Sequence, residues 1–334
     1  MKQKLNFEPR WFAIIIFFMA GVFLGAFVLF IWIFNGGRFY GIQRNHTNSN
    51  YKFIHPLIAV EREQIADFFS NNKLQTKLTK IIDKHKKNQD VQEAAIYFRD
   101  LDFGRWVGLN EDLRFSPGKL MKVPIMITYF RQAESDPKVL QKQLKYIVDP
   151  KIASRNNQVG LQNNEIYPVA KLIEAMIIDD DDNSANLLFD NINRGSLNEV
   201  FSDLGINFKE DKENEDFITV KQYSLFFRIL YNSTYLSRQY SERSLEVLSQ
   251  TPNTDGVSIG LPNDLIVANK YRTRSFNQGR SRLKESHDCG IVYFPKHPYL
   301  ICTMGVGINN MAIDNTFKEL SQAVYNDMSE TYKN

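Results

Sequence analysis

The sequence predicts an α+β fold that follows a single membrane-spanning helix. Three observations lead to this prediction: an uncharged apolar run near the N-terminus, strand-like segments near both ends of the remaining chain, and a block of helical periodicity between them. Because strands from the two ends can pair with one another, we expect one five-stranded antiparallel sheet flanked by helices. The middle block then forms a mostly helical subdomain.

The apolar run, WFAIIIFFMAGVFLGAFVLFIWIF, covers residues 11–34 without a charged side chain. At ~1.5 Å per residue, a helix of this length spans the ~30 Å hydrocarbon core of a bilayer. Trp11 and Trp32 lie near its ends, where interfacial aromatic residues gather. The run is also longer than the apolar core of a cleaved signal peptide. We therefore expect a cytoplasmic tail at 1–10, a transmembrane anchor at 11–34, a linker at 35–58 and a folded domain at 59–334.

The orientation of the anchor depends on few charges. Lys2, Lys4 and Arg10 precede the span and favour a cytoplasmic N-terminus, which predicts a single-pass protein of the cell membrane with an extracytoplasmic C-terminal domain. Gly21 and Gly25 form a G-x-x-x-G pattern that suits pairing of two anchors, so a purely structural membrane partner is an alternative. The pattern does not set an oligomeric state.

The composition argues against some classes of partner. Hydrophobic residues make up 43 % of the chain and charged residues 24 %, and the net charge of +3 gives no reason to expect nucleic-acid binding. No motif indicates a cofactor. Cys289 and Cys302 lie on neighbouring apolar runs, where a cross-strand disulfide and two buried free thiols both fit. We expect free thiols, because an isolated cysteine usually behaves as a small buried hydrophobe.

Strand and helix patterns follow one another in a definite order after the linker. Helical periodicity covers residues 61–87, and two strands with a tight turn at 102–104 cover 93–115. Ser116, which precedes a proline, suits the N-cap of the next helix, in which Pro124 would produce a kink. Further helices are expected at 138–144, 169–178, 184–192, 220–231, 241–248 and 317–332, and further strands at 265–271, 290–294 and 299–306.

The stretch FSPGKLMKVPIM, residues 115–126, offers two placements of a catalytic pair. Ser116 and Lys119 have the Ser-x-x-Lys spacing that sets a hydroxyl one helical turn from a general base. Lys119 and Lys122 have the same spacing without a hydroxyl. The first placement predicts an enzyme, whereas the second lacks a nucleophilic oxygen.

From about Leu74 to its C-terminus the chain resembles the class A β-lactamase-like serine hydrolases, which share their fold with the penicillin-binding DD-peptidases. The segments that carry the resemblance are YFRDLDFGRWVGLNEDLRFSP, LMKVPIM, AMIIDDDDNSANLL, ITVKQYSLFFRILYNSTYLS and HDCGIVYFPKHPYLICTMG, in the family's order. The resemblance implies a β-lactamase/transpeptidase-like fold. It also implies acyl-enzyme chemistry through three motifs, S-x-x-K, S-D-N and K-T-G, with neither cofactor nor metal.

The resemblance places Lys119 where the family has its nucleophile. Family members read F-S-P-A-S-L-L-K-V-P, and without a gap on FSPGKLMKVP this puts the nucleophile on Lys119 and the general base on Lys122. A shift of three residues gives the alternative, with Ser116 as nucleophile and Lys119 as base. That shift moves the helix relative to the matching segments on either side.

The second and third motifs also depart from the family. The S-D-N positions fall on Asp180, Asp181 and Asp182, within a run of four aspartates, and a one-residue slip restores the asparagine without the serine. Three roles are open to this run. It would bind a cation such as Ca²⁺, lie solvated at a helix N-terminus, or neutralise Lys119 and Lys122 in an internal ion-pair cluster. In the third motif Lys270 is kept, whereas Arg272 stands where the family has glycine.

These departures predict a catalytically inactive, membrane-anchored member of this fold with a binding or scaffolding role at the cell envelope. Peptidoglycan peptides and β-lactam-like molecules are the ligands that the resemblance implies. The degenerate motif positions are Lys119, Lys122, Asp180, Asp182 and Lys270. The alternative is an active serine hydrolase, of β-lactamase or DD-peptidase type, that uses Ser116 and Lys119.

Overall fold

The computed structural model describes residues 51–55, 72–116, 118–148, 160–206, 218–252, 254–278 and 281–333. The expected tail and anchor lie outside these residues, as do most of the linker and the first part of the helix expected at 61–87. Within the described ranges, no helix combines the length and the apolar character that a membrane crossing requires.

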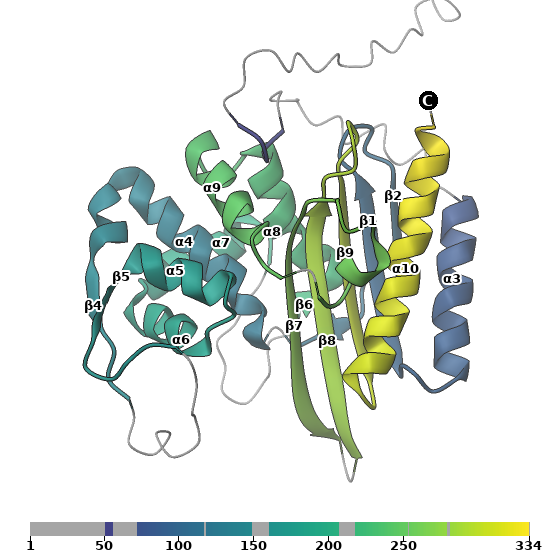
Figure 1. Ribbon diagram of the computed structural model, residues 1–334, viewed down its shortest axis with the longest axis horizontal. Coiled ribbons are helices and arrows are strands. Elements are labelled where there is room, and N and C mark those ends of the chain that lie inside the picture. Colours follow the sequence, from purple (N-terminus) through teal and green to yellow (C-terminus); the bar gives the residue numbers. More distant parts are fainter. Residues whose placement is uncertain are drawn as a thin grey trace, which may run out of the picture. The chain divides into compact units, whose positions relative to one another are not determined.

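A five-stranded antiparallel sheet forms the centre of the fold, as predicted (Figure 1). Its strand order is β2-β1-β9-β8-β7, so the first strands of the domain join the last ones through the β1–β9 pair. The strands are β1 (Glu93–Asp100), β2 (Trp106–Leu109), β7 (Val267–Gln278), β8 (Ser281–Val292) and β9 (Tyr299–Gly307). Strand β7 lies at one edge of this sheet.

The register decides which side chains share a face of the sheet. Lys270 of β7 lies opposite Cys289 of β8, and Cys289 lies opposite Cys302 of β9. Because side chains alternate along a strand, Lys270 and Arg272 share one face and Tyr271 lies on the other. The face with Lys270 belongs to the core of the helical layer, and the opposite face to a second core under the terminal helices.

Two long helices cover that second face: α3 (Asn72–Lys87) and α10 (Asn310–Thr331), which pack against each other and the sheet (Figure 1). Phe317, Leu320 and Val324 of α10 are fully buried there. Burying a side chain of this size stabilises a fold by roughly 1.5–3 kcal/mol. The closing helix predicted at 317–332 is thus present and begins earlier.

The mostly helical layer covers the other face of the sheet. Its helix α8 (Val220–Asn232) contacts β1, β8 and β9 and buries Phe226 and Phe227. The other elements of this layer are β3 (Arg114–Phe115), η1 (Gly118–Met121), α4 (Lys122–Ser135), η2 (Pro137–Gln141), β4 (Gln143–Lys145), β5 (Ile166–Pro168), α5 (Val169–Ile177), α6 (Asp182–Asn191), α7 (Arg194–Asp203), β6 (Ile218–Thr219) and α9 (Arg238–Leu248). The turn η3 (Ser258–Gly260) packs against α10 instead.

The helix expected directly after Ser116 begins later than predicted. The 3₁₀ turn η1 comes first, and α4 starts at Lys122 with Met121 in the N-cap position. Ser116 therefore does not cap α4. Pro124 lies in the first turn of α4, where its missing N–H leaves no helical hydrogen bond unmade, so it has no reason to kink the helix.

Other elements also differ from the prediction. Residues 138–144 divide between η2 and β4 instead of forming an α-helix, and α7 was not expected. Strands β7 and β8 extend well beyond 265–271 and 290–294, as a regular hairpin in which Arg274 lies opposite Glu285. The additional residues of these strands include many charged side chains. A pattern of alternating apolar residues therefore does not reveal them as strand.

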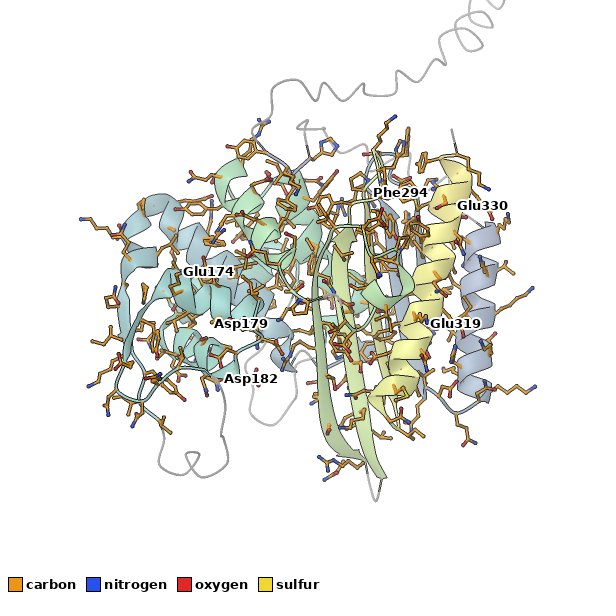
Figure 2. All side chains as sticks on the ribbon, in the orientation of Figure 1. Glu174, Asp179, Asp182, Phe294, Glu319 and Glu330 are labelled. Atoms are coloured by element: carbon orange, nitrogen blue, oxygen red, sulfur yellow. A yellow bond between two sulfur atoms is a disulfide. The ribbon has the colours of Figure 1, made fainter. Side chains whose placement is uncertain are left out.

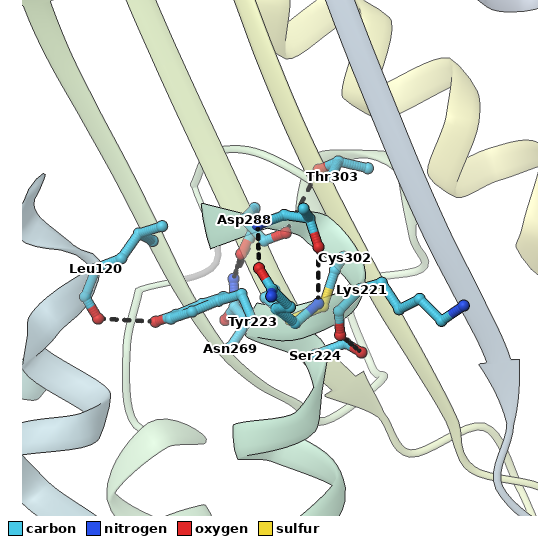
Figure 3. The surroundings of a disulfide bond; sticks show 11 residues. Leu120, Lys221, Tyr223, Ser224, Asn269, Asp288, Cys302 and Thr303 are labelled. Atoms are coloured by element: carbon cyan, nitrogen blue, oxygen red, sulfur yellow. Dashed lines mark hydrogen bonds between the residues drawn. A yellow bond between two sulfur atoms is a disulfide. The ribbon is translucent and has the colours of Figure 1, made fainter. Parts of the chain in front are cut away.

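Cys289 and Cys302 form a disulfide between neighbouring strands (Figure 3), so the expectation of two free thiols is wrong. The two residues are direct partners in the β8–β9 register, with their Cα atoms 4.0 Å apart. Sequence alone does not reveal that register, because a shift of one residue would turn one cysteine to the opposite face.

Candidate functional site

A short loop between α5 and α6 presents Asp180 to three cationic side chains. Asp180 has a left-handed backbone conformation, with φ of 57°, which aspartate adopts more readily than most residues. Asp181 is the N-cap of α6, and its carboxylate accepts the N–H groups of Asn183 at 3.3 Å and Ser184 at 2.8 Å. These bonds fix the loop at the start of α6. Figure 2 shows Asp179 and Asp182 where α5 and α6 adjoin.

Lys122, the first residue of α4, contacts this loop from the interior of the protein. Its side chain is only 2 % exposed. Its Nζ donates to the backbone oxygen of Asp180 at 2.7 Å and lies 2.9 Å from Asp180 Oδ1 and 3.0 Å from Asp182 Oδ1. The Nζ of Lys122 is thus surrounded by two carboxylate oxygens and a carbonyl oxygen, all of which accept its hydrogens.

The start of α4 is itself fixed from the helical layer (Figure 3). The hydroxyl of Tyr223 in α8 donates to the backbone oxygen of Leu120 in η1 at 3.1 Å. Tyr223 is fully buried, and burial raises its pKa, so the phenol remains a donor. The turn that precedes Lys122 is thus fastened to the helix that packs on the sheet.

Lys270 and Arg272 approach Asp180 from strand β7. Lys270 Nζ donates to the backbone oxygen of Ile177 at 2.8 Å and lies 2.8 Å from Asp180 Oδ1. Burial, and then the neighbouring ammonium of Lys122, lower the pKa of Lys270 to about 7. Arg272 pairs with Asp180 Oδ2, and its Nη2 lies 3.4 Å from Asp182 Oδ1. Burial lowers the pKa of Arg272 to about 10, which still leaves the guanidinium charged at neutral pH.

The structure therefore brings four sequence-predicted residues together: Lys122, Asp180, Asp182 and Lys270. Arg272 completes the cluster, and the five residues are called the ion-pair cluster below. The third reading of the aspartate run paired it with Lys119 and Lys122. The structure shows that pairing for Lys122, and adds Lys270 and Arg272 to it. Since Asp180 and Asp182 are engaged by cationic side chains, they are poorly placed to share a calcium ion.

The two remaining candidates, Ser116 and Lys119, lie on the segment that precedes α4. The backbone of Lys119 lies in η1, just before α4. Ser116 is buried, and its backbone N–H donates to Glu285 Oε1 at 3.2 Å. The structure ties Ser116 by its backbone to strand β8.

A second group of charged residues surrounds that contact, and sequence reasoning missed it. Glu285 pairs with Arg274, and its Oε1 lies 3.4 Å from His287 Nε2. Burial of Glu285 opposes ionisation, but His287 and Arg274 outweigh it and lower the pKa of Glu285. The ring of His287 packs edge-on against Phe115 at 5.5 Å. The signal in the sequence that could have revealed this group is the alternation of charged residues in β7 and β8.

Comparisons with known proteins agree with this fold. Residues 73–328 match the model of a family described as the β-lactamase enzyme family. No curated protein matches the sequence.

Solved structures resemble the chain over most of its length. An acyl-enzyme complex of a mutant of PBP-A with penicillin G has 20 % sequence identity, a TM-score of 0.64, and coverage of 78 % of this chain and 98 % of its own. The extended-spectrum β-lactamase TLA-3 has 15 % identity, a TM-score of 0.65, and coverage of 76 % and 99 %. A β-lactamase from Xanthomonas campestris pv. campestris has 18 % identity, a TM-score of 0.61, and coverage of 76 % and 98 %. At these identities the likeness shows the fold.

Proposed function

Because the chain belongs to the β-lactamase enzyme family, we propose that it is a catalytically inactive member, which binds ligands of the family's kind without hydrolysing them. The proposal depends first on the position of the nucleophile. The gap-free comparison of FSPGKLMKVP puts Lys119 there, and an amine in place of the hydroxyl removes the attacking oxygen. Loss of the serine from a catalytic unit lowers kcat by roughly 10⁶ in a well-studied protease.

The observation that carries the proposal is the environment of Lys122. A general base must offer a free lone pair to the nucleophile. Lys122 instead directs its Nζ to Asp180 and Asp182, at distances of 2.7 to 3.0 Å. Two features therefore support the proposal: Lys119 brings no hydroxyl to the expected nucleophile position, and the Nζ of Lys122 faces carboxylates.

The ligand side of the proposal depends on Lys270 and Arg272. In the family, the corresponding strand presents a cation and a close-approaching backbone to the substrate carboxylate. Here both cations face Asp180, and with Lys122 they give the ion-pair cluster three cations against two carboxylates, which leaves an excess of positive charge. We propose that carboxylate-bearing peptides, such as peptidoglycan stem peptides, or β-lactam-like molecules bind beside this cluster. The PBP-A complex with penicillin G illustrates such a ligand in a protein of the same fold.

Turnover of a chromogenic cephalosporin tests the proposal. The full chain, purified in detergent, should hydrolyse it no faster than buffer, while an active class A β-lactamase in the same detergent serves as positive control. The Ser116→Ala variant should behave identically. Hydrolysis that disappears in Ser116→Ala would instead establish the alternative, a serine hydrolase that uses Ser116 and Lys119.

Binding is tested by titrating the full chain with a stem pentapeptide that ends in a free carboxylate. Heat of binding is expected for this peptide and not for its C-terminal amide. Equal binding of the peptide and its amide would contradict the proposal that Lys270 and Arg272 of β7 recognise the carboxylate of the ligand.

We further propose that residues 11–34 anchor the protein in the cell membrane, with the domain on the extracytoplasmic side. The apolar length of this segment and the basic residues before it support the proposal. Protease added outside spheroplasts that express the full chain should digest a C-terminal tag. A tag protected until the membrane is dissolved would contradict the orientation.

A further inference from the structure

Three aromatic rings stack at the end of the sheet where β1 and β8 finish. Phe103 lies in the β1–β2 turn, His297 in the β8–β9 turn and Tyr332 at the C-cap of α10. The His297 and Tyr332 ring centroids are 3.8 Å apart with an interplanar angle of 12°, and Phe103 stacks on Tyr332 at 5.9 Å. Phe103 is nevertheless 56 % exposed. This is a large apolar side chain held in order at the surface instead of in a core.

Polar contacts hold the stack in place from behind. His297 Nδ1 lies 2.8 Å from Asp102 Oδ2, and the hydroxyl of Tyr332 donates to Asp100 Oδ2. The backbone N–H of Leu101 donates to Pro298 O at 3.1 Å, which joins the two turns. The exposed ring is therefore pre-ordered, and little conformational entropy remains to be lost on contact with a partner.

Basic side chains flank the stack. Lys296 and Lys333 are exposed, and Lys296 has a left-handed backbone with φ of 63°, a conformation in which glycine or asparagine is commoner than lysine. The acids nearby face cations: Asp100 lies 3.4 Å and Asp327 3.6 Å from the guanidinium of Arg105. Lys296 and Lys333 place two positive charges at the rim of the stack.

The chain enters the domain at the same end of the sheet. Phe53 packs edge-on against Tyr293 at 5.4 Å, and the hydroxyl of Tyr293 donates to Phe53 O at 2.9 Å. Tyr293 begins the turn that carries His297, and Figure 2 shows its neighbour Phe294 at the end where α10 finishes. If residues 11–34 span the bilayer, only residues 35–50 separate it from this entry point. Sixteen residues reach at most about 55 Å when fully extended, which limits the distance between the bilayer and this entry point.

We propose that this surface, formed by Phe103, Lys296, His297, Tyr332 and Lys333 and called the aromatic end surface, docks on the lipid headgroup region of the membrane that holds the anchor. Aromatic rings with a polar edge favour the interface between headgroups and acyl chains, and lysines at its rim attract anionic lipids. The inference rests on the proposed membrane anchoring. It orients the domain with the β7–β8 hairpin, at the opposite end of the sheet, directed away from the lipid.

Photo-crosslinking of the full chain in lipid nanodiscs tests the inference. Phe103 is replaced by p-benzoylphenylalanine in one variant, and Phe276, near the tip of the hairpin, in a matched control. After irradiation in nanodiscs that contain phosphatidylglycerol, mass spectrometry should find a lipid adduct at position 103 at least about fivefold more often than at 276. Equal yields at the two positions, or adducts at 103 with a second copy of the chain, would overturn the proposal.

The charge contribution is tested on the position 103 variant by adding Lys296→Glu and Lys333→Glu. The lipid adduct should fall at least about threefold in nanodiscs with phosphatidylglycerol and change little in pure phosphatidylcholine. An unchanged yield in both bilayers would contradict the role of the lysines. A chain that fails to enter nanodiscs at all defeats the anchoring proposal itself, whereas a chain that enters and shows equal crosslinks defeats only the docking surface.

Discussion

The ammonium of Lys122 and the carboxylate of Asp180 lie 2.9 Å apart, and the same Asp180 Oδ1 lies 2.8 Å from the ammonium of Lys270. One carboxylate thus bridges a cation of helix α4 and a cation of strand β7, and it pairs through its other oxygen with Arg272. The helical layer and the sheet are thus joined by charge through the ion-pair cluster.

Asp180→Asn should destabilise the domain, because three cations would lose the anion between them. Breaking a buried ion pair costs about 3–5 kcal/mol, and the 40 % exposure of the Asp180 side chain reduces this to about 2–4 kcal/mol. Urea unfolding followed by circular dichroism measures the change. Asp179→Asn, at an exposed neighbouring position, is the matched control and should shift the midpoint little.

The double variant Asp180→Asn/Lys270→Met tests the cause of that loss. Removing one of the stranded cations should recover part of the stability, so the double variant should be more stable than Asp180→Asn alone. Additive losses from the two substitutions would mean that the residues do not interact in the folded state.

Restoring the nucleophile alone should not restore acylation. In Lys119→Ser, the Nζ of Lys122 remains bound to Asp180 and Asp182, so we expect that it does not take the proton of the new serine. Adding Asp180→Ser and Asp182→Asn recreates the family's S-D-N and releases Lys122. Labelling by a fluorescent penicillin is expected only in the triple variant. Equal labelling of Lys119→Ser by itself would show that the ion-pair cluster does not block the base.

The disulfide should contribute measurably to stability. Replacing Cys289 and Cys302 by alanine opens a loop with a sequence separation of 13, and cross-links of that span stabilise folds by about 3 kcal/mol. Thermal unfolding with and without a reductant measures the effect. Alkylation of the unfolded, unreduced chain should add no mass. Two alkylated cysteines under those conditions would contradict the pairing.

Asp288 should make stability depend on pH. Burial raises the pKa of Asp288 to about 7, against 3.8 for an ordinary aspartate, despite hydrogen bonds from Asn269 and the N–H of Val257. A folded-state pKa above the unfolded one means that the folded chain binds the proton more tightly. The contribution of Asp288 to the free energy of unfolding is therefore fully present below about pH 4. It is lost as pH rises towards 7, by about 1.4 kcal/mol per unit of pKa difference.

Unfolding free energies between pH 4 and 7 check this sign. Asp314, whose pKa burial raises to about 6, should add to the loss in the same direction. Asp288→Asn should flatten the profile over this range, whereas Asp264→Asn, at an exposed position, should not. A wild-type profile that rises from pH 4 to 7 and is unchanged by Asp288→Asn would contradict the account.

Much of the fold followed from sequence patterns, and the exceptions have physical reasons. The apolar runs of β1 and β9, which are buried on both faces, and the periodicity of α5 and α8 were sufficient to place these elements. The length of the β7–β8 hairpin was underestimated because its strands carry charged side chains. Arg272 and Arg274 lie on the same face of β7, where Asp180 and Glu285 pair with them. Such pairings between distant segments leave no local pattern.

The sequence predicted most of the residues that form the candidate site but not the contacts between them. Asp180 and Lys270 could be named from motif positions, yet their contact depends on the loop that Asp181 fixes and on the register of β7. The same limit applies to Cys289 and Cys302, whose pairing is set by register. Ser116 was expected to cap a helix, but η1 intervenes, and its backbone is tied to Glu285 instead.

The most direct test of the central claim is the intact mass of the full chain after incubation with penicillin G. The account predicts an unchanged mass, because no hydroxyl stands at the nucleophile position and Lys122 is held by Asp180 and Asp182. A mass increased by one penicillin, with the adduct located on Ser116 or any other serine of residues 59–334, would contradict it.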